Sequence, residues 1–171
     1  VPLEERLYHK RLYAALAYIR ANGLNRITID PPQARLGIVS AGKSYQDVRK
    51  ALQSLGLDEA DAARLGVRVL KLGVVWPVEP DIVRRFAQGL EQIVVVEEKR
   101  PMIETQLRAI LYGGGHAPRV IGKVRDGNLY DAQPSWVFPN FGELKSTQIA
   151  QVLAGALAQI EPSFAQWRPP V

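Results

Sequence analysis

Four short apolar runs, rich in β-branched residues, alternate along this chain with segments that repeat apolar residues at helical spacing. Strands separated by helices in this way form βαβ units, in which consecutive strands run parallel and helices cover both faces of the sheet. The alternation therefore predicts an α/β fold, a three-layer α/β/α sandwich with a mostly parallel sheet. The predicted strands are residues 34–40, 67–75, 91–98 and 118–124, and the predicted helices are residues 44–56, 80–90 and 101–115, with a short helical connector at residues 58–66.

Further elements are predicted before and after this alternation. Residues 3–21 repeat apolar residues at helical spacing, and residues 26–30 alternate like a short strand. Near the other end, residues 126–142 have the glycine and proline content of a loop, and residues 146–160 form an amphipathic helix. We expect a neighbouring domain to cover the aromatic residues of that loop, Trp136, Phe138 and Phe141.

These elements divide the chain into three parts. Residues 1–30 are expected to pack as a helix and short strand on a main α/β domain at residues 31–160. The proline-rich residues 161–171 are interpreted as a linker to a following domain. Because the chain starts at Val1 without methionine or a signal core, we expect it to have been cut from a longer protein. The lack of cysteine fits a cytoplasmic setting.

Composition excludes several classes of function. The 171 residues are 47% hydrophobic and 23% charged, which suits one ordinary globular core. No apolar run approaches the ~20 residues that span a bilayer, so no membrane segment is expected. With no cysteine, this segment has no disulfide, no cysteine zinc site and no iron–sulfur ligand. The net charge of +5 is scattered among acids rather than gathered in a basic stripe, which argues against nucleic-acid binding.

The stretch Gly37-x-x-x-x-Gly42-Lys43-Ser44 matches the pattern of a phosphate-binding P-loop. A working P-loop begins at the end of its strand, but Gly37 lies inside an apolar run whose Ile38 and Val39 suit a buried strand. We therefore interpret the match as chance, with a strand to about Val39, a tight turn over Ser40–Lys43 and a helix from about Ser44. The alternative is a nucleotide-, anion- or coenzyme A-binding module that uses Ser40, Gly42, Lys43 and Ser44.

Two further groups of candidate residues follow predicted strands at the same edge of the sheet. Glu97, Glu98 and Lys99 follow one strand, and Trp76 and Pro77 follow another. Because consecutive strand residues point to opposite faces, the two carboxylates are not expected to converge on a catalytic centre or a metal. We interpret these residues as a domain interface, with Trp76 as its hydrophobic anchor.

Four stretches of the sequence together resemble one family. They are "ARLGIVSAGKSYQDVRKAL", "GVRVLKLGVVWPVEPDIVRRFAQGLEQIVVVEEKRPMIETQLRAILY", "RVIGK" and "GEL". They are similar to the indolepyruvate:ferredoxin oxidoreductases, in the segment between the two thiamine-diphosphate-binding domains of the large subunit. The resemblance covers about Arg11 to Leu157 and implies a transketolase C-terminal-like fold. One departure is Lys145-Ser146, where the family pattern leads us to expect Ser-Pro at the start of the last helix.

The same resemblance implies a function for the parent enzyme. Such enzymes decarboxylate an aryl or branched-chain 2-oxoacid oxidatively to an acyl-CoA and pass the electrons to ferredoxin. The implied cofactors are thiamine diphosphate, Mg²⁺ and 4Fe-4S clusters, and the implied partners are other domains or subunits, ferredoxin and coenzyme A. No cofactor, metal or catalytic residue is expected in this segment, which is expected to be inactive alone. The sequence is also compatible with assembly of this chain into a homo-oligomer.

Overall fold

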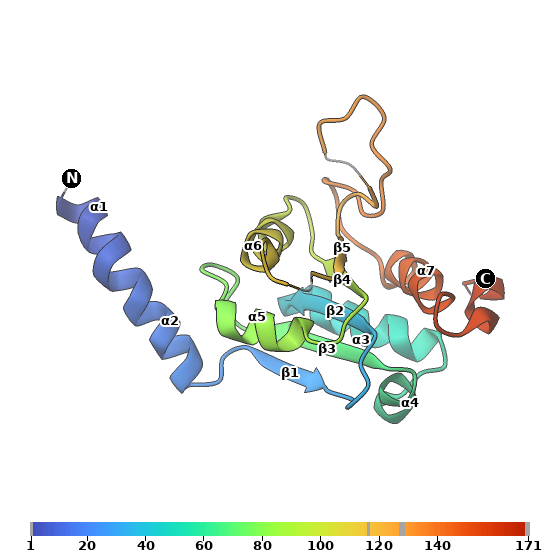
Figure 1. The fold of residues 1–171 in the computed structure, drawn as a ribbon. Coiled ribbons are helices and arrows are strands. Elements are labelled where there is room, and N and C mark those ends of the chain that lie inside the picture. The colour runs from blue at the N-terminus through green and yellow to red at the C-terminus, as the bar shows by residue number, and fades with distance from the viewer. Residues whose placement is uncertain (1, 116, 127–128, 170–171) are drawn as a thin grey trace.

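The computed structural model describes residues 2–115, 117–126 and 129–169, and it contains a five-stranded sheet in the order β1-β3-β2-β4-β5 (Figure 1). The last four strands in that order pair in parallel, whereas β1 pairs antiparallel with β3. The predicted mostly parallel α/β sheet is therefore confirmed. The strands are β1 (Arg26–Ile29), β2 (Leu36–Ala41), β3 (Val67–Leu72), β4 (Gln92–Val96) and β5 (Arg119–Ile121).

Helices cover both faces of this sheet because its central strands are apolar on both sides. Along β2, Leu36 and Ile38 pack into one hydrophobic cluster, and Val39 packs into the other. The first cluster includes residues of α3 (Gly42–Ser54), α4 (Glu59–Arg64) and α7 (Ser146–Leu157). The second cluster includes residues of α5 (Pro80–Ala87) and α6 (Met102–Leu111). Each predicted helix of the alternation is present, within a few residues of its expected bounds.

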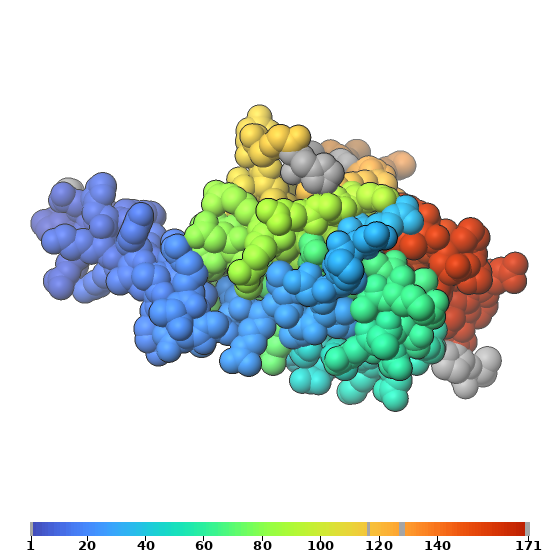
Figure 2. Space-filling model, turned by 60° about the horizontal axis from the view of Figure 1, so that its bottom comes forward, coloured from blue at the N-terminus to red at the C-terminus, as the bar shows by residue number. Residues whose placement is uncertain are grey.

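The N-terminal helix projects from this body (Figures 1 and 2). It consists of α1 (Pro2–Arg6), a π-helical turn η1 (Leu7–Arg11) and α2 (Leu12–Ala21), and its one buried residue is Ile19. Arg20 fastens its end to the start of α5, with Nη1 2.9 Å from Asp81 Oδ2 and Nε 3.4 Å from Glu79 Oε1. In the described part of the chain, no helix is both long and apolar enough to span a membrane.

The described residues between β5 and the last helix form a loop (Figure 1). Val124 and Trp136 form an isolated β-bridge, and Phe138 is fully buried in the first cluster. At the start of α7, Gln148 Oε1 accepts a hydrogen bond from the Lys145 backbone N–H at 3.1 Å. The chain thus reaches the start of α7 through a loop with one buried aromatic residue.

The described residues that follow α7 fold back on the body. Residues Pro162–Gln166 form the 3₁₀ helix η2, and Trp167 packs against the first cluster. Its indole Nε1 donates to the Ser54 carbonyl at 3.3 Å. Residues 170 and 171 of the expected linker lie outside the described residues, and its role as a linker stays a prediction.

Candidate functional site

The strand β2 runs directly into helix α3, with no loop between them. The strand continues to Ala41 and the helix begins at Gly42, so the predicted tight turn over Ser40–Lys43 is wrong. Ser40 is a fully buried strand residue whose hydroxyl has no hydrogen-bond partner in the described part of the chain. Gly42, at φ +52°, makes the change of direction in a single left-handed residue, which a glycine adopts without steric cost.

Gly37 lies inside the paired strand, as the sequence predicted. Its neighbours explain why it is glycine: an added Cβ would lie 2.5 Å from Leu90 Cδ1 and 2.7 Å from Phe86 Cζ. The residues from Gly37 to Ala41 are therefore paired with the neighbouring strands β3 and β4. They do not form an open loop whose backbone N–H groups could surround a phosphate. The geometry gives the nucleotide alternative no support.

Lys43 is surrounded by carboxylates. Its Nζ lies 2.9 Å from Asp47 Oδ2, 2.9 Å from Glu143 Oε1 and 3.4 Å from Glu98 Oε1. Two hydrogen bonds raise the pKa of the Lys43 ammonium above its ordinary value; the one to Asp47 has the larger effect and the one to Glu143 the next largest. The charge of Lys43 is therefore already balanced by its own neighbours.

A hollow of about 650 Å³ lies at the carboxyl ends of β2 and β4. We call it the edge hollow. It combines residues from four chain segments, which the parallel strands bring to one edge. Its lining residues are Ala41, Ser44, Val75, Val96, Glu97–Arg100, Met102, Ile103 and Asn140–Gly142. Four of the predicted site residues, Ser44, Glu97, Glu98 and Lys99, therefore lie together here.

The two adjacent carboxylates of the edge hollow point to different partners. Glu97 accepts the backbone N–H groups of Ile103 and Glu104 at 2.8 and 2.9 Å and so caps α6. Glu98 accepts from Lys43 and from the Leu144 backbone N–H at 3.2 Å. Burial raises the pKa of the Glu97 carboxyl above its ordinary value, and the two backbone N–H groups oppose this.

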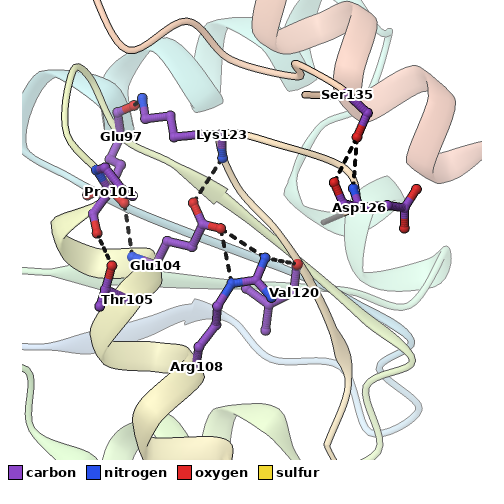
Figure 3. Close-up of polar contacts among 9 residues, drawn as sticks. All are labelled: Glu97, Pro101, Glu104, Thr105, Arg108, Val120, Lys123, Asp126 and Ser135. Carbon is purple, nitrogen blue, oxygen red and sulfur yellow. Dashed lines mark hydrogen bonds and ion pairs between the residues drawn. The ribbon is translucent and has the colours of Figure 1, made fainter. Parts of the chain in front are cut away.

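A buried lysine that sequence reasoning missed supports the wall of the edge hollow (Figure 3). Lys123 is 1% exposed, and its Nζ donates to the carbonyls of Glu97 and Pro139, the latter at 3.2 Å. Its backbone N–H donates to Glu104 Oε2 at 2.9 Å, while Glu104 Oε1 accepts from Arg108. The only signal for it in the sequence is one lysine within the apolar run 118–124.

Apolar side chains stand exposed around the edge hollow. Trp76 is 56% exposed, Met102 51% and Phe141 80%, and Val75 is also exposed. Pro77 follows Trp76 and is half-buried. The predicted interface residues after β3 and β4 are thus brought to one edge, although Glu97 is used inside the fold.

Another hollow, of about 960 Å³, lies between α3 and α4 and contains none of the predicted site residues. One of its cations, Arg49, is already paired with Glu59. Over the described ranges, no three histidine, aspartate or glutamate residues form a group able to hold a metal ion. The edge hollow, which holds four of the predicted site residues, is therefore the better candidate.

Two solved structures share this arrangement of strands and helices. A 2-oxoglutarate:ferredoxin oxidoreductase from Magnetococcus marinus matches over 92% of this chain and 24% of its own chain, with a TM-score of 0.53 and 16% identity. A split-gene transketolase, solved as an inactive beta4 tetramer, matches over 80% of this chain and 42% of its own, with a TM-score of 0.51 and 16% identity. At this identity the likeness establishes the fold, that of the α/β domains of transketolases and 2-oxoacid:ferredoxin oxidoreductases.

The family follows from the sequence match. The sequence model of the family described as the indolepyruvate oxidoreductase domain matches residues 26–166, and the chain belongs to that family. The subunit IorA of the indolepyruvate oxidoreductase from Thermococcus kodakarensis is 32% identical over 135 residues, which cover 77% of this chain and 20% of the relative. The IorA of Pyrococcus abyssi is 36% identical over 101 residues, 59% of this chain and 14% of the relative. The chain thus spans a fifth or less of the length of these curated relatives.

Proposed function

We propose that this chain is a non-catalytic interface domain of a thiamine-diphosphate-dependent 2-oxoacid:ferredoxin oxidoreductase that acts on indolepyruvate. The parent enzyme decarboxylates its 2-oxoacid oxidatively to an acyl-CoA and passes the electrons to ferredoxin. In this proposal the domain orients the domains that carry the cofactors, and the edge hollow is the surface by which it contacts one of them. The fragment has no activity of its own. We place the enzyme in the cytoplasm.

One observation carries the proposal. The edge hollow exposes Val75, Met102 and Phe141 together, and the exposed Trp76 follows Val75 in the chain, while the carboxylates of the hollow are bonded within the domain. Apolar residues gathered at one place on a surface mark a protein interface, and an aromatic residue at the centre is the usual source of binding energy. A catalytic carboxylate, in contrast, needs an oxygen free to exchange a proton with a substrate. Both oxygens of Glu97 accept backbone N–H groups, and Glu98 is paired with Lys43 through Oε1.

The cofactors of the parent do not fit the residues of this chain. Thiamine diphosphate requires a Mg²⁺ site, but Asp47, Glu98 and Glu143 are all engaged by Lys43. Iron–sulfur clusters require cysteine, which this sequence lacks. We therefore assign thiamine diphosphate, Mg²⁺ and the 4Fe-4S clusters to other parts of the enzyme. Ferredoxin and coenzyme A are partners of the whole enzyme in this proposal, and the direct partners of the domain are neighbouring domains or subunits.

The interface role can be tested by truncating its proposed aromatic anchor, Trp76, in the intact oxidoreductase. Trp76→Ala should weaken the packing of this domain and lower the temperature at which the enzyme loses activity, because a buried interface tryptophan contributes about 2 kcal/mol or more. Tyr112→Ala is the matched control, since Tyr112 is 90% exposed at the far end of α6. Equal effects of the two substitutions would contradict the proposal.

The non-catalytic role can be tested at Glu98. Loss of a general acid or base lowers kcat by about 10²–10⁴-fold and removes one limb of the pH profile. Glu98→Gln should instead leave the shape of that profile as it is in the wild-type enzyme, even if the domain packs less tightly. A hundredfold fall in kcat in an enzyme that is still fully assembled would assign a catalytic role to Glu98.

A further inference from the structure

The edge hollow has an uneven distribution of charge. Glu97 accepts N–H groups of α6 with both of its oxygens, and the charge of Glu98 is paired with Lys43 through Oε1. Lys99 and Arg100 line the same hollow, are exposed, and form no ion pair among the residues that the structure describes. The unpaired charge at this place is therefore positive.

The backbone at Lys99 adds a second observation. Lys99 has φ +57°, the one positive φ of a non-glycine residue in the described chain. Glycine is more stable than any residue with a Cβ in this region. Strained residues of this kind cluster at functional sites, and Lys99 is followed by Arg100, which also forms no ion pair within the described ranges.

A third observation is an unsatisfied amide. Asn140 lines the edge hollow, and its Oδ1 is buried without a hydrogen-bond partner among the residues that the structure describes. Buried polar atoms are nearly always bonded, so an orphan acceptor at the wall of a hollow is suited to a donor that arrives with a binding partner. The backbone N–H of a polypeptide segment is such a donor.

We propose that the edge hollow receives an acidic segment of a neighbouring domain or subunit, in which an apolar side chain stands beside aspartate or glutamate. The apolar side chain enters between Val75, Met102 and Phe141, the carboxylate pairs with Lys99 and Arg100, and a backbone N–H bonds Asn140. This rests on the proposed interface function and adds the chemistry of the partner. A polypeptide fits better than a small aryl carboxylate because the exposed Trp76, which does not line the hollow, extends the apolar surface beyond it.

Carbodiimide cross-linking of the intact oxidoreductase tests the carboxylate directly, because this reagent joins an amine to a carboxylate only when the two touch. We expect mass spectrometry to find Lys99 linked to an aspartate or glutamate of another domain or subunit. In Lys99→Arg, which keeps the charge but removes the primary amine, this link should disappear while assembly is retained. A Lys99 link only to carboxylates of this domain, a link to a second copy of it, or no link would each overturn the proposal.

Charge reversal separates this proposal from the proposed function. Lys99→Glu with Arg100→Glu should weaken assembly about tenfold and reduce its salt dependence. The control is Lys50→Glu with Arg85→Glu, which makes the same change of charge at exposed residues elsewhere. If Trp76→Ala with Phe141→Ser weakens assembly but the reversal acts like its control, the acidic partner is wrong and the interface stands. If neither weakens assembly, both fail. Binding of indole-3-acetate that depends on Lys99 would assign the hollow to a small aryl carboxylate and overturn the acidic segment.

Discussion

At the scale of single residues, Gly37 and Gly42 are glycines for two different reasons. Gly37 has no room for a Cβ, because Phe86 and Leu90 press against the strand. Gly42 has open space around it but a positive φ of +52°. The sheet and the start of α3 therefore account for both glycines of the apparent nucleotide motif without any ligand.

The steric role of Gly37 predicts a loss of stability on substitution. Gly37→Ala should lower the free energy of unfolding by about 1–3 kcal/mol, the usual cost of adding a methyl group to a filled core. Gly155→Ala is the matched control, because Gly155 lies in α7 with nothing within 4 Å, and alanine there should stabilise by roughly 0.5–1 kcal/mol. Urea denaturation of the two variants measures both. A Gly37→Ala variant as stable as wild type would place Gly37 outside the core.

The left-handed backbone at Lys99 predicts the opposite result. Lys99→Gly should raise the free energy of unfolding by about 1 kcal/mol, because it removes the steric cost of a Cβ at φ +57°. At Lys50, an exposed residue inside α3, the same substitution should instead cost about 1 kcal/mol. Chemical denaturation checks the sign of each. Destabilisation at both positions would mean that Lys99 is not strained.

At the scale of elements, the end of β4, the start of α6 and the segment after β5 are joined through buried charges. Glu97 caps α6, and Glu104 holds the backbone of Lys123. Gly122 leaves room for this arrangement, since a Cβ there would lie 1.9 Å from Glu104 Oε2. The wall of the edge hollow is thus held by hydrogen bonds among the end of β4, the start of α6 and the segment after β5.

The buried lysine makes stability depend on pH. Burial lowers the pKa of the Lys123 ammonium below its ordinary value, and the nearby carboxylates of Glu97 and Glu104 offset part of this. Between the lowered pKa and the unfolded value of about 10.4, the unfolded chain binds more protons than the folded one, so stability rises with pH in this window. Relative to Lys123→Met, the wild-type chain should gain stability from neutral pH towards pH 10.

This difference can be measured by urea unfolding of both chains over that pH range. The other lysines and the tyrosines titrate alike in the two chains, so their contributions cancel in the comparison. The Lys123 contribution is complete above the unfolded pKa and is lost as the pH falls through the lowered folded pKa. A constant difference between the two chains would mean that Lys123 keeps its ordinary pKa.

At the scale of the whole molecule, stability is concentrated in the two clusters that flank the sheet. The N-terminal helix contributes little to either cluster, since α1 and η1 have no buried residue and α2 has only Ile19. We expect deletion of residues 1–17, which keeps Ile19 and Arg20, to change the free energy of unfolding by less than about 0.5 kcal/mol. A clearly lower urea midpoint would show that the helix packs on the body.

The order and type of elements could be read from the chain because each is encoded locally. An apolar run such as residues 91–98 indicates a strand that is buried on both faces, and apolar residues at helical spacing, as in residues 80–90, indicate a helix that is buried on one face. Both patterns can be recognised without knowledge of the rest of the fold. The start of α3 was misplaced because a single left-handed glycine replaced the expected turn. Of the loop aromatics, Phe138 is buried in the domain itself, whereas Phe141 is exposed, and local pattern does not distinguish them.

The sequence by itself determined the parallel α/β sheet, the family and the edge at which the candidate residues gather, because these follow from local patterns and from strand direction. Only the tertiary structure decided how each charge is used. It placed Glu97 on the start of α6, balanced Lys43 with three carboxylates, buried Lys123 and left Lys99 and Arg100 without an ion pair to any described residue. The physical reason is that the free energy of a charge depends on its neighbours in space, and in this chain those neighbours are up to 100 residues away in sequence.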